Sequence, residues 1–391
     1  MAKIKNIRAH KILDSRGEWT IETEISLDNG IISRASVPQG KSVGSFEAKS
    51  VLPDKAIESI EKTITPMLIG RSPEDQHEID DLMISADNTP DKSNLGANSI
   101  LGISLNCART ASLASNIPLW KYLASKFDLS ANTNPKLFLN VINGGLHAGN
   151  NLRFQEYLII PKGETLDDSV NIGVNVYQAV KKYLIKNLGA SASNLGDEGG
   201  FAPNFPNELA PFEILEKVIK EEGLEEKIDF GIDAAANSIK SNSHELAPIY
   251  NEMKKRFNIY YLEDPYKENE FKNFSKIKGE IGETTIIAGD DLTTTNVIRM
   301  KKAKEQDCIN GIIIKPNQIG TLSETIEAIK LAKEWGWKVI VSHRSGETND
   351  DFIIDLALGS GADGIKTGAP ARGERIAKFN RLLQMQREEL N

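Results

Sequence analysis

The chain has 391 residues, of which 40% are apolar and 26% charged, with a formal net charge of −8 and two cysteines. This length exceeds what one hydrophobic core usually serves, so it predicts two domains, one of them large enough for a barrel of about 250 residues. The composition excludes a disulfide-stabilised scaffold and a paired-cysteine zinc site. The sequence has no apolar run of membrane-spanning length and no basic block typical of nucleic-acid binding.

The sequence begins with MAKIKNIRAH, which has no apolar stretch after its lysines and so lacks the core of a secretory signal. We therefore expect a cytoplasmic protein, with neither a membrane nor a nucleic acid among its partners.

The first third of the chain predicts a small sheet followed by helices. Apolar and polar residues alternate over 19–27, Asp28-Asn29-Gly30 provides a tight turn, and 31–37 returns as the next strand. Apolar residues then take helical spacing in three stretches, 55–70, 73–84 and 97–114. We expect an N-terminal α+β capping domain over residues 1–130 and a catalytic β/α barrel over 131–391.

The rest of the chain alternates short Ile- and Val-rich runs with helix-like stretches. Six runs end on polar residues that lie 23 to 30 residues apart, a length that suits one parallel strand and its crossover helix. Because all parallel strands of a barrel end at the same mouth, we expect these six residues to converge. They are Asp233, Glu263, Asp290, Lys315, His343 and Lys366.

Three of the six are carboxylates on consecutive strands. Like charges in a partly desolvated site raise each other's pKa, and a divalent cation resolves that conflict. Oxygen ligation without cysteine favours Mg2+ or Mn2+ over zinc. We predict that Asp233, Glu263 and Asp290 are metal ligands; the alternative is that each acid caps the helix that follows it.

Lys315 ends the apolar run GIIIK. Burial beside cations would lower its pKa and leave a neutral fraction, as a general base requires; the alternative is a structural lysine paired with one of the acids. Two glycine-rich segments carry His147 and Glu198, and we expect both segments to be loops over the barrel mouth.

The sequence resembles enolases in these segments, through INGGLHAGNN, GDEGGFAPN, LEDP, GDDLTTTN, IKPNQIGTLSET and SHRSGET. The resemblance extends from DSRG near residue 14 to the last helix. It implies an eight-stranded β/α barrel, with its first strands out of the usual order, behind a small α+β cap. It also implies Mg2+-dependent, reversible dehydration of 2-phosphoglycerate to phosphoenolpyruvate in glycolysis and gluconeogenesis, by a homodimer or a higher homo-oligomer.

The same resemblance implies roles for the metal ligands and the proton-transfer groups. Asp233, Glu263 and Asp290 match the ligands of a first Mg2+. Ser42 matches a serine of a mobile loop that closes over the substrate and helps to hold a second Mg2+, which arrives with the substrate. Lys315 matches the base that takes the C2 proton.

The remaining matches surround the substrate. Glu198 resembles the acid that helps the C3 hydroxyl to leave, and Glu156 and His147 match positions on the same leaving-group side, with Gln155 beside them. Lys366 matches a lysine that contacts the substrate carboxylate. The segment of His343, Arg344 and Ser345 matches the clamp for the phosphate and the substrate.

The closing loop departs from the family pattern. It reads VPQGKSVG where enolases usually have Pro-Ser-Gly-Ala-Ser-Thr-Gly, so Gln39, Lys41 and Val43 are substitutions. One alternative is therefore a paralogue that acts on a related phospho- or phosphono-carboxylate. Another is a non-catalytic binding protein on the same scaffold, which the intact acids, base and clamp disfavour.

Overall fold

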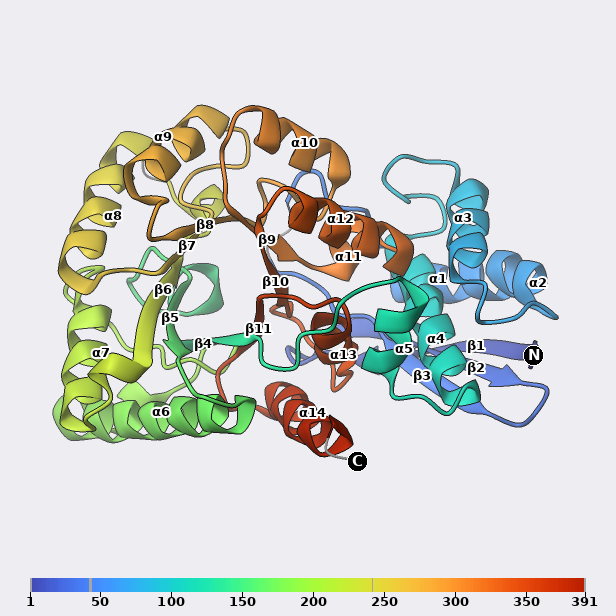
Figure 1. The fold of residues 1–391 in the computed structure, drawn as a ribbon, viewed down its shortest axis with the longest axis horizontal. Helices are drawn as coiled ribbons and strands as arrows, with labels where there is room; N and C mark the ends of the chain where they lie inside the picture. The colour runs from blue at the N-terminus through green and yellow to red at the C-terminus, as the bar shows by residue number, and fades with distance from the viewer. Residues whose placement is uncertain (1, 42–43, 241, 390–391) are drawn as a thin grey trace.

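The computed structural model describes residues 2–41, 44–240 and 242–389. An N-terminal sheet with its helices lies beside a barrel (Figure 1). The sheet is antiparallel, with the strand order β1-β2-β3. Its strands are β1 (Ile4–Leu13), β2 (Trp19–Leu27) and β3 (Ile32–Ser36). The alternation that predicted β2 places Ile21, Ile25 and Leu27 in the core.

The helices of this first part follow the predicted stretches with one interruption. They are α1 (Pro53–Ser59), the π-helical turn η1 (Ile60–Ile64), α2 (Thr65–Leu68), α3 (Gln76–Asp87), α4 (Ala97–Ala114) and α5 (Leu119–Lys126). The π turn comes directly before the start of α2, where Pro66 has no N–H for the regular ladder. The predicted helix over 55–70 is therefore three consecutive segments.

Helix α4 is buried along nearly its whole length because it lies against the sheet. A Cβ on Gly102 would come within 2.7 Å of the Thr23 side chain, so this close approach requires glycine. Thr23 Oγ1 donates a hydrogen bond of 2.8 Å to the Gly102 carbonyl, and Asn106 Nδ2 donates one of 2.9 Å to the Thr23 carbonyl. These bonds satisfy polar groups that would otherwise be buried without partners.

The second part is a closed barrel of eight strands in the order β10-β11-β4-β5-β6-β7-β8-β9. The strands are β4 (Lys136–Asn143), β5 (Glu156–Pro161), β6 (Ile228–Asp233), β7 (Tyr261–Glu263), β8 (Ile286–Gly289), β9 (Gly311–Ile314), β10 (Lys338–Ser342) and β11 (Gly364–Gly368). Strand β5 runs antiparallel to both β4 and β6, whereas the other pairs are parallel. The predicted fold class is confirmed, including the departure of the first strands from the usual pattern, since β5 follows β4 without an α-helix between them and runs in the reverse direction.

Helices surround the barrel strands in Figure 1. The α-helices are α6 (Leu166–Leu188), α7 (Ala210–Glu221), α8 (Ser243–Phe257), α9 (Phe271–Ile281), α10 (Val297–Glu305), α11 (Pro316–Ile319), α12 (Leu322–Glu334), α13 (Phe352–Gly359) and α14 (Gly373–Glu389). Short 3-10 turns are η2 (Gly145–His147), η3 (Ala190–Ser193), η4 (Glu225–Lys227) and η5 (Ala236–Ser238). Within the described ranges, none of the helices combines the length and apolar character that a bilayer span requires.

The barrel interior is filled by apolar side chains from alternate strand positions, as a packed barrel requires. They come from six strands: Phe138, Leu158, Ile160, Tyr261, Ile286, Ala288, Ile313 and Ile340. This apolar layer fills the barrel below the mouth, so the polar strand ends lie above a packed core. The predicted domain boundary after residue 130 falls between α5 and β4, and as a domain limit it stays a prediction.

An arginine of α4 joins the N-terminal part to the barrel. Arg109 Nη1 and Nη2 donate to the two carboxylate oxygens of Asp350 at 2.8 and 2.9 Å. The side chains are 19% and 8% exposed. Burial raises the pKa of Asp350, but Arg109 outweighs it and holds that pKa below its ordinary value.

We predict that Arg109→Ala lowers the free energy of unfolding by about 3–5 kcal/mol, because it leaves the Asp350 carboxylate buried and unpaired. Urea unfolding followed by circular dichroism measures the change. Arg34→Ala is the matched control, since Arg34 pairs with Glu24 but is 63% exposed. Equal and small effects of the two substitutions would contradict the role given to Arg109.

Candidate active site

Lys366 lies among three carboxylates at the barrel mouth. Its Nζ is 2.7 Å from Glu263 Oε2, 2.9 Å from Asp233 Oδ2 and 3.0 Å from Glu156 Oε1. All four residues are buried. Burial lowers the pKa of Lys366, but the carboxylates outweigh it and raise that pKa well above its ordinary value, so the lysine stays charged.

Glu156 reaches the mouth because β5 is reversed. It is the first residue of β5 and lies opposite Asp233, the last residue of β6, in the antiparallel register. The preceding residue, Gln155, donates from Nε2 to Asp233 Oδ2 at 3.2 Å. One strand therefore begins at the mouth, where the other strands end, and its start brings two predicted site residues there, Glu156 on the strand and Gln155 directly before it.

Lys315 forms an ion pair with Asp290, the next acid around the barrel. Asp290 also accepts a hydrogen bond of 2.8 Å from Gln318 Nε2. Burial lowers the pKa of Lys315, but Asp290 outweighs it, so that pKa lies above its ordinary value. Our prediction of a lowered pKa is wrong for this arrangement, because the alternative pairing of this lysine with an acid is present, and the partner is Asp290.

Glu198 is buried among three nitrogen-bearing side chains on the other side of the mouth. Asn140 Nδ2 donates to its Oε2 at 2.9 Å, while Oε1 lies 3.3 Å from His147 Nδ1 and 3.5 Å from His343 Nε2. Burial raises the pKa of Glu198, but His147 and then His343 outweigh it and hold that pKa well below its ordinary value.

The pKa of Glu156 is shifted in the opposite direction from that of Glu198, although the two residues are neighbours. Burial, and next the charge of Glu198, raise the pKa of Glu156 well above its ordinary value. Ligand atoms of His147, Glu156 and Glu198 lie within 4.8 Å of one another. Two neighbouring carboxyl groups with divergent pKa values are typical of a site that stores and transfers a proton.

The predicted phosphate clamp is held by the loop from the N-terminal part. Arg344 donates to both oxygens of Glu47, at 2.9 and 3.2 Å, and both side chains are only 4% exposed. Ser345 Oγ accepts from the backbone N–H of Lys41 at 2.7 Å. Predicted residue Ser42 and the substituted Val43 lie outside the described residues.

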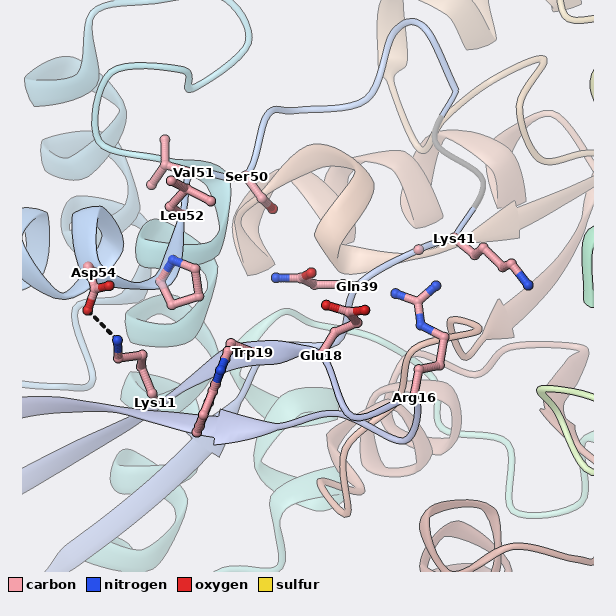
Figure 2. A pocket seen from close by; sticks show the side chains of 12 residues that line it. Lys11, Arg16, Glu18, Trp19, Gln39, Lys41, Ser50, Val51, Leu52 and Asp54 are labelled. Atoms are coloured by element: carbon pink, nitrogen blue, oxygen red, sulfur yellow. Dashed lines mark ion pairs between the residues drawn. The ribbon is translucent and has the colours of Figure 1, made fainter.

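Lys41, the substituted cation of this loop, forms an ion pair of 3.0 Å with Asp197, directly before Glu198 in the chain. Gln39 pairs through its backbone with Gly346. Both loop residues line a groove of about 850 Å3 next to Arg16 and the edge of the N-terminal sheet. In Figure 2 the side chains of Gln39 and Lys41 point in opposite directions, Gln39 into this groove.

The candidate active site itself is almost filled by its own side chains. The cavity holds about 10 Å3, close to the minimum for one water molecule. Its lining includes the predicted residues His147, Gln155, Glu156, Glu198, Lys315, His343, Arg344, Ser345 and Lys366. A substrate of several carbon atoms therefore has to displace some of the ion pairs.

The acidic residues fit a divalent cation. Their donors are oxygen atoms, which Mg2+ prefers. Oε1 of Glu263 is buried without a hydrogen-bond partner in the described part of the chain. Burial, and next the charge of Asp233, raise the pKa of Glu263 to about 8. A cation bound to Glu263 would give this oxygen a partner and favour the ionised carboxylate. Besides His147, Glu156 and Glu198, the described residues contain one more group whose ligand atoms lie within 4.8 Å of one another, Asp264, Asp290 and Asp291. Of the three predicted ligands, only Asp290 belongs to it, so Asp233 and Glu263 as ligands stay a prediction.

Three residues that support the site were not predicted from the sequence. Glu47 anchors Arg344, Asn140 binds Glu198, and Arg375 contacts His343 at 2.7 Å. Asn140 had a signal, since it is a polar residue inside the apolar run LFLNVI. Glu47 and Arg375 had none, because their partners are about 300 and 30 residues away.

Family models and curated relatives match nearly the whole chain. Family models described as "Enolase, N-terminal domain" and "Enolase, C-terminal TIM barrel domain" match residues 4–123 and 132–391. The enolase of Methanopyrus kandleri is 41% identical over 414 aligned residues, which cover 99% of this chain and 96% of the relative. The enolase of Methanosarcina acetivorans is 42% identical, with 99% and 94% covered, and that of Solanum lycopersicum 38%, with 99% and 96% covered.

We predict that Mg2+ alone raises the Tm of the protein and that Glu263→Gln abolishes this increase. Binding to the folded state contributes about 2.7 kcal/mol when the free ion exceeds its Kd about 100-fold. Differential scanning fluorimetry across a Mg2+ series measures the effect. Asp229→Asn is the control. Asp229 lies near the start of β6, away from the barrel mouth, and pairs with Lys162. An undiminished Mg2+ effect in Glu263→Gln would rule out Glu263 as a ligand.

Proposed function

Because the chain belongs to the enolase family of carbon–oxygen lyases, we propose that it dehydrates 2-phosphoglycerate reversibly to phosphoenolpyruvate, in glycolysis and gluconeogenesis, with Mg2+. The observation that carries this proposal is the cluster of buried carboxylates and lysines at the barrel mouth, next to an arginine and serine clamp. Such a site suits a small phosphorylated carboxylate, which brings several negative charges and has one weakly acidic proton to lose.

Asp233, Glu263 and Asp290 are the proposed holders of one Mg2+. A second would arrive with the substrate, and Ser42, outside the described residues, is its proposed ligand in this chain. When bound, the two ions would stabilise the negative charge that develops on the substrate carboxylate as the C2 proton leaves. Lys366 contributes a further positive charge on the same side.

Lys315 is the proposed base that removes the C2 proton. Its ion pair with Asp290 keeps it protonated, so this contact must open before it can act. Asp290 has other partners available at the mouth, since Gln318 already donates to its second oxygen. A base released by substrate binding would act only when the substrate is in place.

The C3 hydroxyl leaves on the side of Glu198, Glu156 and His147. The hydroxyl takes a proton as the C3–O bond breaks, and departs as water. Glu198 is the proposed donor at the moment of reaction. The adjacent Glu156, whose pKa is raised, is the group that stores a proton for Glu198. His343, Arg344 and Ser345 are the proposed holders of the phosphate, and Gln155 lies next to Asp233.

The substituted loop supports a second candidate, a paralogue that acts on a related phospho- or phosphono-carboxylate. Gln39 and Lys41 lie next to the clamp, and Lys41 extends its charge to Asp197. A non-catalytic binding role has less support, because the proposed base, acids and clamp are all present. We further propose a homodimer or a higher homo-oligomer in the cytoplasm.

Absorbance of the enol phosphate product tests the proposed function. The protein, given 2-phosphoglycerate and Mg2+, should produce ultraviolet absorbance that chelation with EDTA abolishes. Turnover of a phosphono analogue without turnover of 2-phosphoglycerate would favour the paralogue. No turnover of either compound would contradict both catalytic functions.

We predict that Lys315→Ala loses exchange of the substrate C2 proton with solvent deuterium, at least about 100-fold, because the base is gone. Glu198→Gln should retain exchange but lose dehydration, because C2 deprotonation precedes the loss of the hydroxyl. Mass spectrometry of recovered 2-phosphoglycerate measures exchange. Lys338→Ala, which removes a lysine paired with Asp363 at the start of β10, is the control. Wild-type exchange in Lys315→Ala would identify another group as the base.

The ion pair of Lys41 and Asp197 should help to hold the loop against the mouth. Because the side chains are 42% and 25% exposed, we predict that Lys41→Ala raises the KM for 2-phosphoglycerate only about two- to fivefold, with kcat unchanged. Added salt should reduce the difference between the two proteins. Lys49→Ala is the control, because Lys49 lies on the same loop as Lys41 but pairs with Asp91. A lower KM in Lys41→Ala would show that this charge opposes substrate binding.

A further inference from the structure

Arg375, in the first turn of α14, is fully buried beneath the clamp. Its Nη1 lies 2.7 Å from His343 Nδ1 and donates to the Arg344 carbonyl at 2.8 Å. Its Nη2 donates to the carbonyls of Ser345 at 2.8 Å and Asp197 at 3.3 Å. One guanidinium thus contacts three consecutive clamp residues and the loop that carries the proposed acid.

The chemistry of arginine determines what His343 does in this contact. A guanidinium has N–H donors, no acceptor, and stays protonated in proteins. Nδ1 of His343 must therefore accept the hydrogen bond from Arg375 with its lone pair. An imidazole that accepts at Nδ1 carries its single proton on Nε2. Both the Nδ1–H tautomer and the imidazolium are incompatible with this geometry.

The other nitrogen of His343 points to the reacting groups. His343 Nε2 is 3.5 Å from Glu198 Oε1 and has no hydrogen-bond partner in the described part of the chain. The His343 side chain is 1% exposed and lines the same cavity as Lys315 and Lys366. Burial, and next the charge of Arg375, hold the pKa of His343 well below its ordinary value, in agreement with a neutral ring.

We infer that Arg375 is a positioning residue that fixes His343 as the neutral Nε2–H tautomer, so that this imidazole presents a hydrogen-bond donor to Glu198 and to the substrate. His343 then cannot serve as a base, and an oxygen of the substrate or of Glu198 is the partner its N–H suits. The identity of that substrate rests on the proposed function. The assignment of the tautomer is independent of the proposed function, because the contact between Arg375 and His343 is present in the ligand-free protein.

Two-bond 1H–15N correlation spectra of the full-length, ligand-free protein labelled with 15N-histidine test the inference. The chain has five histidines, and the signals missing in His343→Gln identify those of His343. The expected wild-type pattern at neutral pH has a pyridine-type Nδ1 and a pyrrole-type Nε2. The reverse pattern, or two pyrrole-type nitrogens, would overturn the inference without any bearing on whether the protein dehydrates 2-phosphoglycerate.

Two variants separate the role of Arg375 from general packing. Arg375→Lys keeps only donors and should retain the wild-type pattern, whereas Arg375→Gln can donate or accept and should lose the single tautomer. Arg381→Gln is the control on the same helix, since Arg381 pairs with Asp355 and Glu388 and should leave the His343 signals unchanged. Unchanged signals in Arg375→Gln would overturn the inference. If Arg375→Gln does not fold, the wild-type pattern and Arg375→Lys decide the question.

Discussion

Buried negative charge at the barrel mouth is the constraint on which the rest of the structure depends. Glu156, Asp233 and Glu263, from three adjacent strands, surround the Nζ of Lys366, next to a cavity that holds hardly one water molecule. Lys366 and Lys315 compensate part of this charge, while burial, and next the charge of Asp233, raise the pKa of Glu263 to about 8. Burying such a cluster is costly for folding, which supports our proposal that it binds a cation and an anionic substrate.

The scaffold supplies rigidity around this charge. The apolar layer inside the barrel keeps the strand ends in place, and the reversed β5 adds Glu156 opposite Asp233. The N-terminal part also supports the mouth, because Glu47 pairs with Arg344 and Arg109 pairs with Asp350, which follows the clamp in the chain. Arg375 joins the clamp to the Glu198 loop from below. Residues of the N-terminal part thus support the site at the barrel mouth.

The sequence predicted the parts of this site that follow from local pattern. Periodic apolar runs with polar ends located six mouth residues, because parallel strands fix where their ends lie. This pattern did not identify Glu156, because Glu156 begins an antiparallel strand and does not end a parallel one. Only the family resemblance indicated Glu156 as a site residue. The pKa of Lys315 was predicted with the wrong sign because burial alone does not reveal a partner such as Asp290. Glu47 and Arg375 depend on contacts between distant segments, which no local pattern encodes.

Anomalous diffraction from crystals soaked in Mn2+ tests most directly the claim that this buried charge is a metal site. Mn2+ prefers the same oxygen ligands as Mg2+ and gives a distinct anomalous signal. The account predicts a peak bounded by Asp233, Glu263 and Asp290, with the Nζ of Lys366 moved away from at least one of the first two carboxylates. A peak only at Asp264 and Asp291, or lysine contacts unchanged at saturating Mn2+, would contradict it.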